Sequence, residues 1–227
     1  MKLSWRVELP QLLIIASVFA LSIWAWQQLP ERIPVHWNIR GEVDGYGSKF
    51  VGLLLMPMVI VATYVLMAVI PLIDPRRANY PSFQKAYSAI RFAVLLFFAA
   101  IHAAIVAASF GPRLNMTYVM LPALGVLFLV IGNFMSKIRP NWFVGVRTPW
   151  TLSSRLSWDK THRLAGWLFL LMGLLFFVVA LVPTAAMYAG MLAFDVICVA
   201  WIIIYSYLVY RRDPHRVNAA GPSADTQ

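Results

Sequence analysis

The sequence predicts an all-α, polytopic membrane protein with six transmembrane helices and both termini in the cytoplasm. Hydrophobic residues make up 61% of the 227 residues and charged residues only 12%, which is far below the charged share of a soluble domain. Apolar segments long enough to cross a bilayer recur along the chain. The candidate spans are Leu9–Leu29, Phe50–Ile73, Ser88–Phe110, Met116–Phe134, Leu164–Val182 and Ala186–Val209.

The distribution of lysine and arginine predicts the orientation of these spans. Of the 19 lysines and arginines, 15 lie at the N-terminus, around the second and fourth connections and in the C-terminal segment, and four lie in the first and third connections. Because basic segments stay in the cytoplasm, this distribution places both termini there. Topology and contact with anionic membrane lipid therefore account for the net charge of +10, and we expect no direct nucleic acid partner.

The first span is expected to remain in the protein, because it follows a short basic N-terminus and no small-residue cleavage site follows it. The next segment, residues 30–49, is predicted to lie outside the cytoplasm. It contains two prolines and three glycines, so we expect it to be irregular and rich in turns. These two spans and their loop form the first predicted unit, residues 1–75.

Two interpretations are open for the polar residues of this outer loop. Asp44-Gly45 and Gly47-Ser48 are typical turn pairs, which favours a structural role. His36, Glu42 and Asp44 are also possible metal ligands, although they lack the spacing of a calcium-binding loop. We favour the structural role and predict no metal site.

The second predicted unit, residues 76–210, contains four helices and a cytoplasmic loop at residues 135–163. Prolines at 71, 75 and 81 break the connection that precedes it into short pieces. Short third and fifth connections make spans three and four, and spans five and six, antiparallel pairs. Residues 211–227 are small, polar and basic, and are predicted to be a disordered tail.

The cytoplasmic loop is unusually rich in cations and indoles. Trp142, Trp150 and Trp158 are interleaved with arginines and lysines, which favours anchoring at the headgroup level over stacking on a ligand. Thr148-Pro149 disfavours helix at Thr148, and Thr151, Ser153 and Ser154 are candidate N-caps of a short helix that leads into the fifth span.

Arg147 is the strongest candidate for a binding residue in this loop. It lies between Gly145 and Pro149, so its backbone is expected to be fixed, with the guanidinium directed into the protein to bind a carboxylate, a phosphate or helix carbonyls. His162 with Asp159 and Thr161 resembles a hydrolase arrangement only superficially, since no nucleophile motif accompanies it. A local hydrogen bond between Asp159 and His162 explains that spacing equally well.

Three polar residues inside the predicted spans are candidates for a role in function or helix packing. Asp195 and His102 are at similar depth near the membrane midplane, so we predict that they form a pair, either as structural glue or as part of a proton, ion or ligand site. Asn133, near the inner end of span four, is expected to form a hydrogen bond at a helix end. The single cysteine, Cys198, lies within span six and excludes an intrachain disulfide.

The loop residues also point to a family. The segment resembles the signature of SdpI-type bacterial immunity proteins, and the matching residues are Asn141, Phe143, Gly145, Arg147, Thr148, Pro149, Trp150, Thr151, Leu152, Trp158, Thr161, His162 and Arg163. The outer loop resembles the domain of unknown function that often precedes it, through Leu29, Pro30, Ile33, Pro34, His36, Trp37, Asn38, Gly41, Asp44, Gly45 and Lys49. Family members often have an acidic residue after the Ser-Ser pair, where this chain has Arg155-Leu156.

This resemblance implies a multi-pass protein of the bacterial plasma membrane that protects a cell against a secreted peptide toxin. It also implies that the outer loop meets the toxin, and that the inner loop binds a cytoplasmic repressor or locks the helices together. The alternative is a small transporter or proton pathway through Asp195 and His102. A membrane enzyme using Arg147 and His162 is the weakest hypothesis, so we predict no catalytic residue and no cofactor, and the oligomeric state is open.

Overall fold

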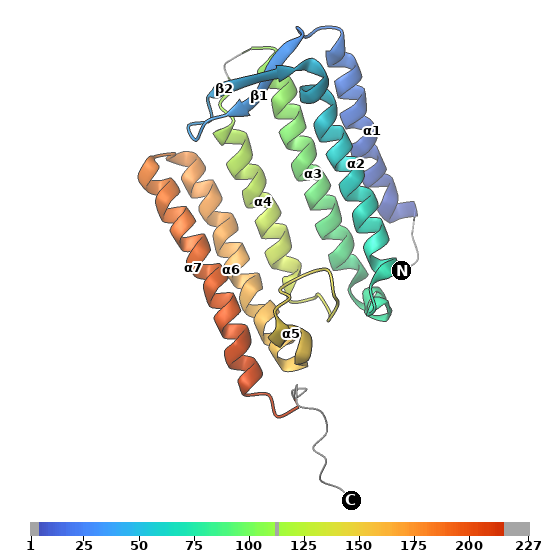
Figure 1. Ribbon diagram of the computed structural model, residues 1–227, viewed down its shortest axis with the longest axis vertical. Helices are drawn as coiled ribbons and strands as arrows, with labels where there is room; N and C mark the ends of the chain where they lie inside the picture. Colours follow the sequence, from blue (N-terminus) through green and yellow to red (C-terminus); the bar gives the residue numbers. More distant parts are fainter. Residues whose placement is uncertain (1–4, 112–113, 216–227) are drawn as a thin grey trace, which may run out of the picture.

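The computed structural model describes residues 5–111 and 114–215 of the chain, and within them six long helices stand side by side (Figure 1). All six are long and apolar enough to cross a membrane, so the predicted all-α, six-span fold is confirmed. The long helices are α1 (Trp5–Trp26), α2 (Lys49–Ile73), α3 (Gln84–Ser109), α4 (Thr117–Met135), α6 (Arg155–Leu181) and α7 (Ala185–Arg211). The short elements are β1 (Arg32–Trp37), β2 (Val43–Ser48), the 3-10 helix η1 (Arg77–Phe83) and α5 (Pro149–Ser153).

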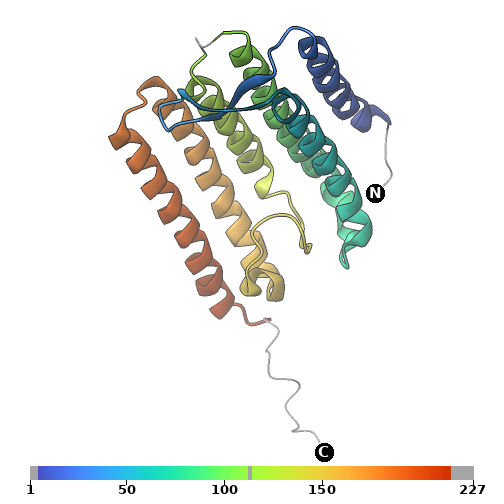
Figure 2. The ribbon, with the colours of Figure 1, turned by 45° about the horizontal axis from the view of Figure 1, so that its top comes forward.

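The helices form two groups that meet at α3 and α4. Helices α1, α2 and α3 contact one another, α4 contacts α3, and α6 and α7 follow in order (Figures 1 and 2). The β-hairpin covers one end of the bundle and α5 lies at the other end, where both described chain ends are also found. Which end faces the cytoplasm stays a prediction, as does the division of the chain at residue 75.

A buried ion pair ties α1 to α3 near the α5 end. Arg91 on α3 binds Glu8 on α1 with two parallel hydrogen bonds of 3.1 and 3.0 Å, and the Tyr64 hydroxyl on α2 donates to the same carboxylate at 2.9 Å. Arg91 is fully buried. A bidentate pair is the geometry that best offsets the cost of placing two charges inside a membrane domain. The sequence analysis did not find this pair.

A second polar junction joins the same three helices closer to the hairpin. The Ser22 hydroxyl on α1 lies 2.8 Å from the Leu53 carbonyl oxygen on α2 and 2.9 Å from His102 Nε2 on α3. Because backbone carbonyls accept the hydroxyl proton, His102 Nε2 must be the donor to Ser22. Between the two junctions Val18, Ile60 and Leu95 pack into an apolar layer.

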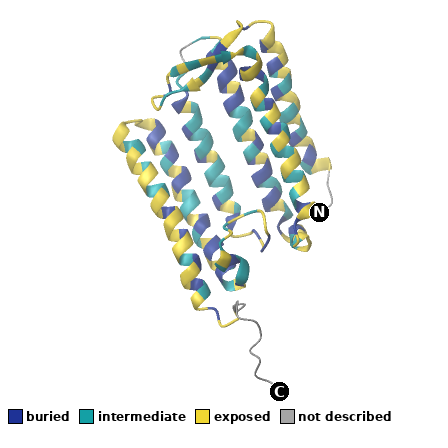
Figure 3. Cartoon of the chain, viewed as in Figure 1, coloured by how far each residue is buried: buried dark blue, intermediate teal, exposed yellow. Residues whose placement is uncertain are grey.

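Close packing of glycines holds α4 against α6. Gly132 faces Gly166, and Gly125 faces Gly173, one heptad further along the antiparallel helices. A Cβ atom on Gly132 would lie 2.8 Å from the Gly166 carbonyl oxygen, so the two backbones are in contact. Small residues at such spacing are the usual means by which membrane helices associate. Helix α7 packs on α6 through one buried stripe and exposes its other face, as expected of a lipid-facing helix (Figure 3).

The outer loop is more regular than the sequence analysis predicted, because residues 32–48 form an antiparallel β-hairpin. The predicted turn pairs Asp44-Gly45 and Gly47-Ser48 lie within β2. Gly45 and Gly47 instead allow close approach of β1, since a Cβ at either would lie 2.9 Å from a β1 side chain. The turn is made by Asn38, whose side-chain oxygen accepts from the backbone of residues 40 and 42, and by Gly41 at φ 74°.

The predicted tail begins inside a helix, because Arg211 is the last residue of α7. Residues 216–227 of that prediction lie outside the described part of the chain.

Candidate functional site

Asn141 organises the loop between α4 and α5. Its side-chain nitrogen donates to the carbonyls of Arg139 and Val144 at 2.9 Å each, and its side-chain oxygen accepts from the backbone N–H groups of Phe143 and Val144. The side chain is fully buried. All four hydrogen-bonding positions of the amide are therefore used to close one turn.

His162 holds the next part of the loop. Its Nδ1 lies 2.8 Å from the Trp158 carbonyl oxygen, so Nδ1 carries the proton, and its Nε2 accepts the Val146 backbone N–H at 3.1 Å. Gly145, at φ 103°, is pressed against the same ring: a Cβ there would lie 2.3 Å from Nε2. Both ring nitrogens are occupied by backbone groups, so His162 serves as a structural lock and has no nitrogen free to act as a base. The alternative of an Asp159–His162 hydrogen bond is wrong, since Asp159 pairs with Arg155.

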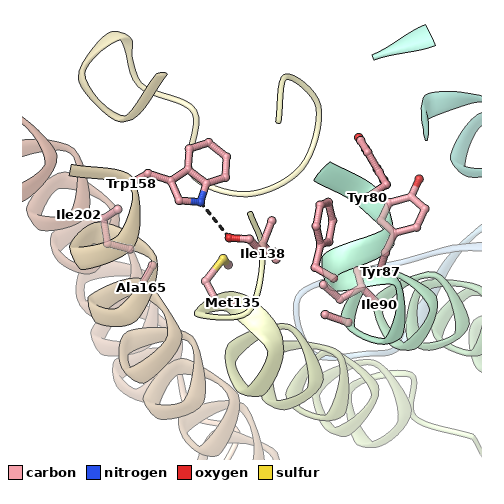
Figure 4. Close-up of a cluster of buried hydrophobic side chains, with 10 residues drawn as sticks. Tyr80, Tyr87, Ile90, Met135, Ile138, Trp158, Ala165 and Ile202 are labelled. Atoms are coloured by element: carbon pink, nitrogen blue, oxygen red, sulfur yellow. Dashed lines mark hydrogen bonds between the residues drawn. The ribbon is translucent and has the colours of Figure 1, made fainter. Parts of the chain in front are cut away.

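Trp158 lies at the centre of the core at this end of the bundle (Figure 4). Its indole nitrogen donates to the Ile138 carbonyl at 2.8 Å, and its ring stacks on His162 with the centroids 4.0 Å apart. The side chain is fully buried, so the prediction that Trp158 anchors at the membrane surface is wrong. Thr161, one residue before His162, is fully buried as well.

The predicted short helix is present as α5, with Pro149 at its first position. Thr148 and Thr151 form a reciprocal capping box at its start, and Ser154 caps α6, so Ser154 is the N-cap that the sequence analysis identified correctly. The Thr148 hydroxyl also lies 3.0 Å from Ser206 Oγ on α7, and the Trp150 ring packs on Tyr207 of that helix. Helix α5 thus ties the loop to α7.

Arg147 does not point into the protein as predicted. Its side chain is exposed, and its Nη1 donates to the Trp142 carbonyl at 2.7 Å. A buried carboxylate is present at this end of the bundle, that of Asp74. It accepts hydrogen bonds from the Trp142 N–H at 3.0 Å and from the Tyr80 hydroxyl at 2.9 Å. Arg147 therefore braces the outside of the loop through the Trp142 carbonyl.

The sequence analysis missed the residues that attach this loop to the first helix group. Asp74 follows α2 directly, Arg76 donates to the Leu152 carbonyl at 3.0 Å, and Asn79 donates to the Pro140 carbonyl at 2.6 Å. On the other side, Ser154 Oγ donates to Asp213 just beyond α7. Asp74 and Asp213 are thus the two carboxylates that hold the loop on its two sides. The sequence signal that could have identified Asp74 was an aspartate at the end of an apolar span.

The hairpin end carries the second candidate site. His36 Nδ1 and Asp44 Oδ1 lie 2.6 Å apart on the exposed surface, and Asn38 and Arg40 bind Glu42. The hydrogen bond from Asn38 and the charge of Arg40 lower the pKa of the Glu42 carboxyl.

The hairpin turn also docks on the start of α4. The Met116 N–H donates to the Gly41 carbonyl at 3.0 Å, and Asn115 donates to the Arg40 carbonyl at 2.7 Å. Pro34, within β1, is buried, and Lys49 forms a 3.0 Å ion pair with Glu31 at the base of the hairpin.

A cavity of about 310 Å³ lies between this hairpin and the starts of α4 and α7. Its lining includes Trp37, Gly41, Thr117 and Tyr188. The indole nitrogen of Trp37 is buried and has no hydrogen-bond partner among the described residues. A buried N–H donor without a partner costs free energy, so Trp37 is a point of unsatisfied polarity beside the cavity.

The predicted pair of His102 and Asp195 is wrong. His102 on α3 binds Ser22, whereas Asp195 lies on α7, and the described helices α3 and α7 share no contact because α4 and α6 stand between them. Asp195 is half-buried. Asn133 is exposed near the end of α4 and does not make the predicted helix-end hydrogen bond within the described residues. Similar depth in the membrane therefore did not bring these residues together.

Comparisons with known proteins agree with the resemblance seen in the sequence. Residues 137–207 match the SdpI/YfhL protein family. The chain contains an SdpI-type segment. Residues 13–61 match the domain of unknown function DUF1648, so both parts of the resemblance are confirmed.

A curated relative extends this likeness. The Immunity protein SdpI of Bacillus subtilis (strain 168) is 21% identical over 201 residues, which cover 88% of this chain and 94% of the relative. No solved structure matches the chain significantly. Together with the six candidate spans, the SdpI relative supports a multi-pass bacterial membrane protein.

Proposed function

We propose that this chain is an immunity-type membrane protein that protects a bacterium against a secreted peptide toxin. The observation that carries the proposal is the alignment with Immunity protein SdpI, which spans 94% of that relative and so includes both the hairpin and the α5 loop. A likeness confined to the apolar spans would carry little information, because any two membrane helices resemble each other in composition.

The hairpin cavity is where we propose that the toxin binds. Its lining includes His36, which pairs with Asp44 on the surface, and Trp37, whose buried indole N–H has no partner among the described residues. A peptide carbonyl or carboxylate would accept a hydrogen bond from that indole while apolar side chains fill the cavity. This end is also the one that we expect to face outward.

The α5 loop is the part that we propose faces a cytoplasmic repressor. Five of its thirteen signature residues are buried and lock the helices, so we place the partner contact on a surface of exposed side chains of the loop. That surface consists of Trp142, which is 46% exposed, Phe143, which is 36% exposed, and the adjacent Arg147. An aromatic pair beside an arginine is typical of a protein contact.

Neither alternative hypothesis gains support from the structure. A proton pathway through His102 and Asp195 lacks its central pair, and the apolar layer of Val18, Ile60 and Leu95 separates the two polar junctions of α1–α3. A membrane enzyme would need a free base, and His162 has both nitrogens bound to backbone groups.

The test is survival of a toxin-sensitive bacterium that expresses the chain and is exposed to the secreted peptides of the source organism, supplied as culture supernatant. We expect protection by the native chain, and reduced protection by Trp37→Phe, which removes the indole N–H and keeps an aromatic ring. The matched control is Trp167→Phe on the exposed face of α6. No protection at confirmed membrane expression would refute the function, and equal protection by both variants would refute the site.

The partner surface has its own test. Trp142→Ala with Phe143→Ala should abolish recruitment of a cytoplasmic DNA-binding protein to the membrane fraction during toxin exposure, while survival stays unchanged. If the native chain recruits no such protein during toxin exposure, the proposed signalling role is refuted and the protective role is unaffected.

A further inference from the structure

Two hollows lie at the α5 end of the bundle, beside the start of the loop that joins α4 to α5. One is a cavity of about 760 Å³ between the start of α1, η1, the first turn of α3 and the end of α4. The other is an apolar groove of about 370 Å³ that runs along α3 and α4. Phe134 lines both, so the groove and the cavity are adjacent at this residue.

The cavity is positively charged. Lys85, Lys137 and Arg139 line it, and no aspartate or glutamate is among its described lining residues. The nearest acidic residue along α1, Glu8, is held by Arg91 and Tyr64. The cavity therefore has three cations that are free to bind an anion.

Two details place an anion at the mouth of the groove. The Lys137 ammonium lies 4.7 Å from the centre of the Phe134 ring, which is the residue shared by the two hollows. The hydroxyl of Ser88, also in the cavity lining, is buried and has no partner among the described residues. A buried serine hydroxyl in a membrane helix normally has a partner, so this one is an unsatisfied polar group beside the cavity.

The groove has the shape that an acyl chain needs. Ala89, Ala93, Ala100 and Ala123 leave space along its floor, and the larger side chains of Phe92 and Leu96 are exposed at its edges. From Ala89 to Ala100 the groove follows α3 for about 16 Å, at 1.5 Å per residue. It is purely apolar, so it matches a hydrocarbon tail and offers nothing to a polar ligand.

We propose that this continuous site binds one anionic phospholipid, with the phosphate among Lys85, Lys137 and Arg139 and an acyl chain in the α3–α4 groove. Basic pockets between membrane helices are a known means of binding anionic headgroups. A free phosphate ion would leave the groove unused, and a zwitterionic lipid carries a second charge that the three cations repel. Among the described long helices, α3 and α4 make the only contact between the two helix groups, so the bound lipid would stabilise that contact.

The experiment measures thermal unfolding of the purified full chain in a neutral detergent, with added phosphatidylglycerol, phosphatidylcholine or inorganic phosphate. Phosphatidylglycerol should raise the unfolding temperature of the native chain, and the other two additives should not. A triple variant, Lys85→Gln, Lys137→Gln and Arg139→Gln, should weaken phosphatidylglycerol binding by about tenfold or more, because each cation near a headgroup contributes several-fold. High salt should also weaken phosphatidylglycerol binding by the native chain, because it screens the attraction between the headgroup and the three cations.

Matched controls separate this site from general charge attraction. Arg77→Gln with Lys160→Gln and Arg212→Gln removes three exposed cations from the same end and should leave the lipid response unchanged. Ala89→Leu fills the groove and should reduce the response, whereas Ala103→Leu on an exposed face of α3 should not. Since Ala89→Leu and the triple variant alter different parts of the site, a folding defect in one leaves the other informative.

Three outcomes would overturn the proposal. The first is an equal rise of the unfolding temperature with phosphatidylglycerol and with phosphatidylcholine. The second is an equal rise with inorganic phosphate. The third is an equal loss of the phosphatidylglycerol response in the triple variant and in the control with three exposed cations replaced. Toxin protection is not part of this measurement, so failure here leaves the proposed immunity function intact.

Discussion

Replacing Gly145 by alanine is the perturbation that most directly tests the role of the SdpI-type loop. Gly145 adopts φ 103°, where L side chains are strained, and its added Cβ would lie 2.3 Å from His162 Nε2. The imidazole cannot move away freely, because its other nitrogen binds the Trp158 carbonyl and its ring stacks on Trp158. The clash is therefore with a fixed group.

The expected cost has two parts. The backbone conformation costs about 1–3 kcal/mol for a residue other than glycine. Displacement of His162 leaves the buried Val146 N–H without its acceptor, which costs about 1–3 kcal/mol more. We expect Gly145→Ala to lower the free energy of unfolding by about 2–6 kcal/mol, a large fraction of the stability of a typical domain.

The assay is reversible unfolding in mixed detergent micelles, monitored by tryptophan fluorescence, since Trp158 reports on this core. Gly190→Ala is the control: it adds a methyl group where no other atom lies within 4 Å, and it should be neutral or slightly stabilising. Combining Gly145→Ala with His162→Ala should cost less than the sum of the single changes, because the clash is then removed. Strict additivity, or a Gly145→Ala variant as stable as the control, would refute the proposed lock.

Three further predictions follow from the bundle. Glu8→Ala should destabilise the protein by about 3–5 kcal/mol by stranding the buried Arg91, and adding Arg91→Met should restore part of that loss; a double variant as unstable as the single one in the same unfolding assay would contradict the pairing. Arg147→Lys should leave unfolding unchanged within about 0.5 kcal/mol, because the side chain is exposed and a lysine can still reach one carbonyl, whereas a large loss would show that the guanidinium has another partner. Reporter fusions after Lys49 and after Arg155 should report opposite sides of the membrane, and the same side for both would disprove the six-span topology.

The pattern of apolar residues was sufficient for the class and the number of spans. A segment that must satisfy its backbone within hydrocarbon has only the helix available, so length and composition decide the element with little help from neighbours. The short helix after Thr148 and the cap at Ser154 were also predictable, because capping depends on residues within one turn. The family signature was recognisable for the same reason, since it is a local string of residues.

Side-chain partners across the bundle depended on the tertiary structure. His102 and Asp195 have similar depths, yet depth says nothing about which helices are neighbours, and α4 and α6 separate them. Trp158 looked like a surface anchor because its sequence neighbours are basic, whereas it is buried in a core shared with Ile138 and stacks on His162. The outer glycines looked like turns because a glycine that allows close strand approach has the same sequence signal as one that allows a turn.

By itself the sequence determined the elements whose physics is local: the six spans, the caps, and the family string around Arg147. Only the tertiary structure decided which polar groups meet, namely Glu8 with Arg91, His102 with Ser22, and Asp74 with the loop N–H of Trp142. The physical reason is that burying a charge or an amide is costly unless a partner is present, and that partner is chosen by the packing of helices far apart in the chain.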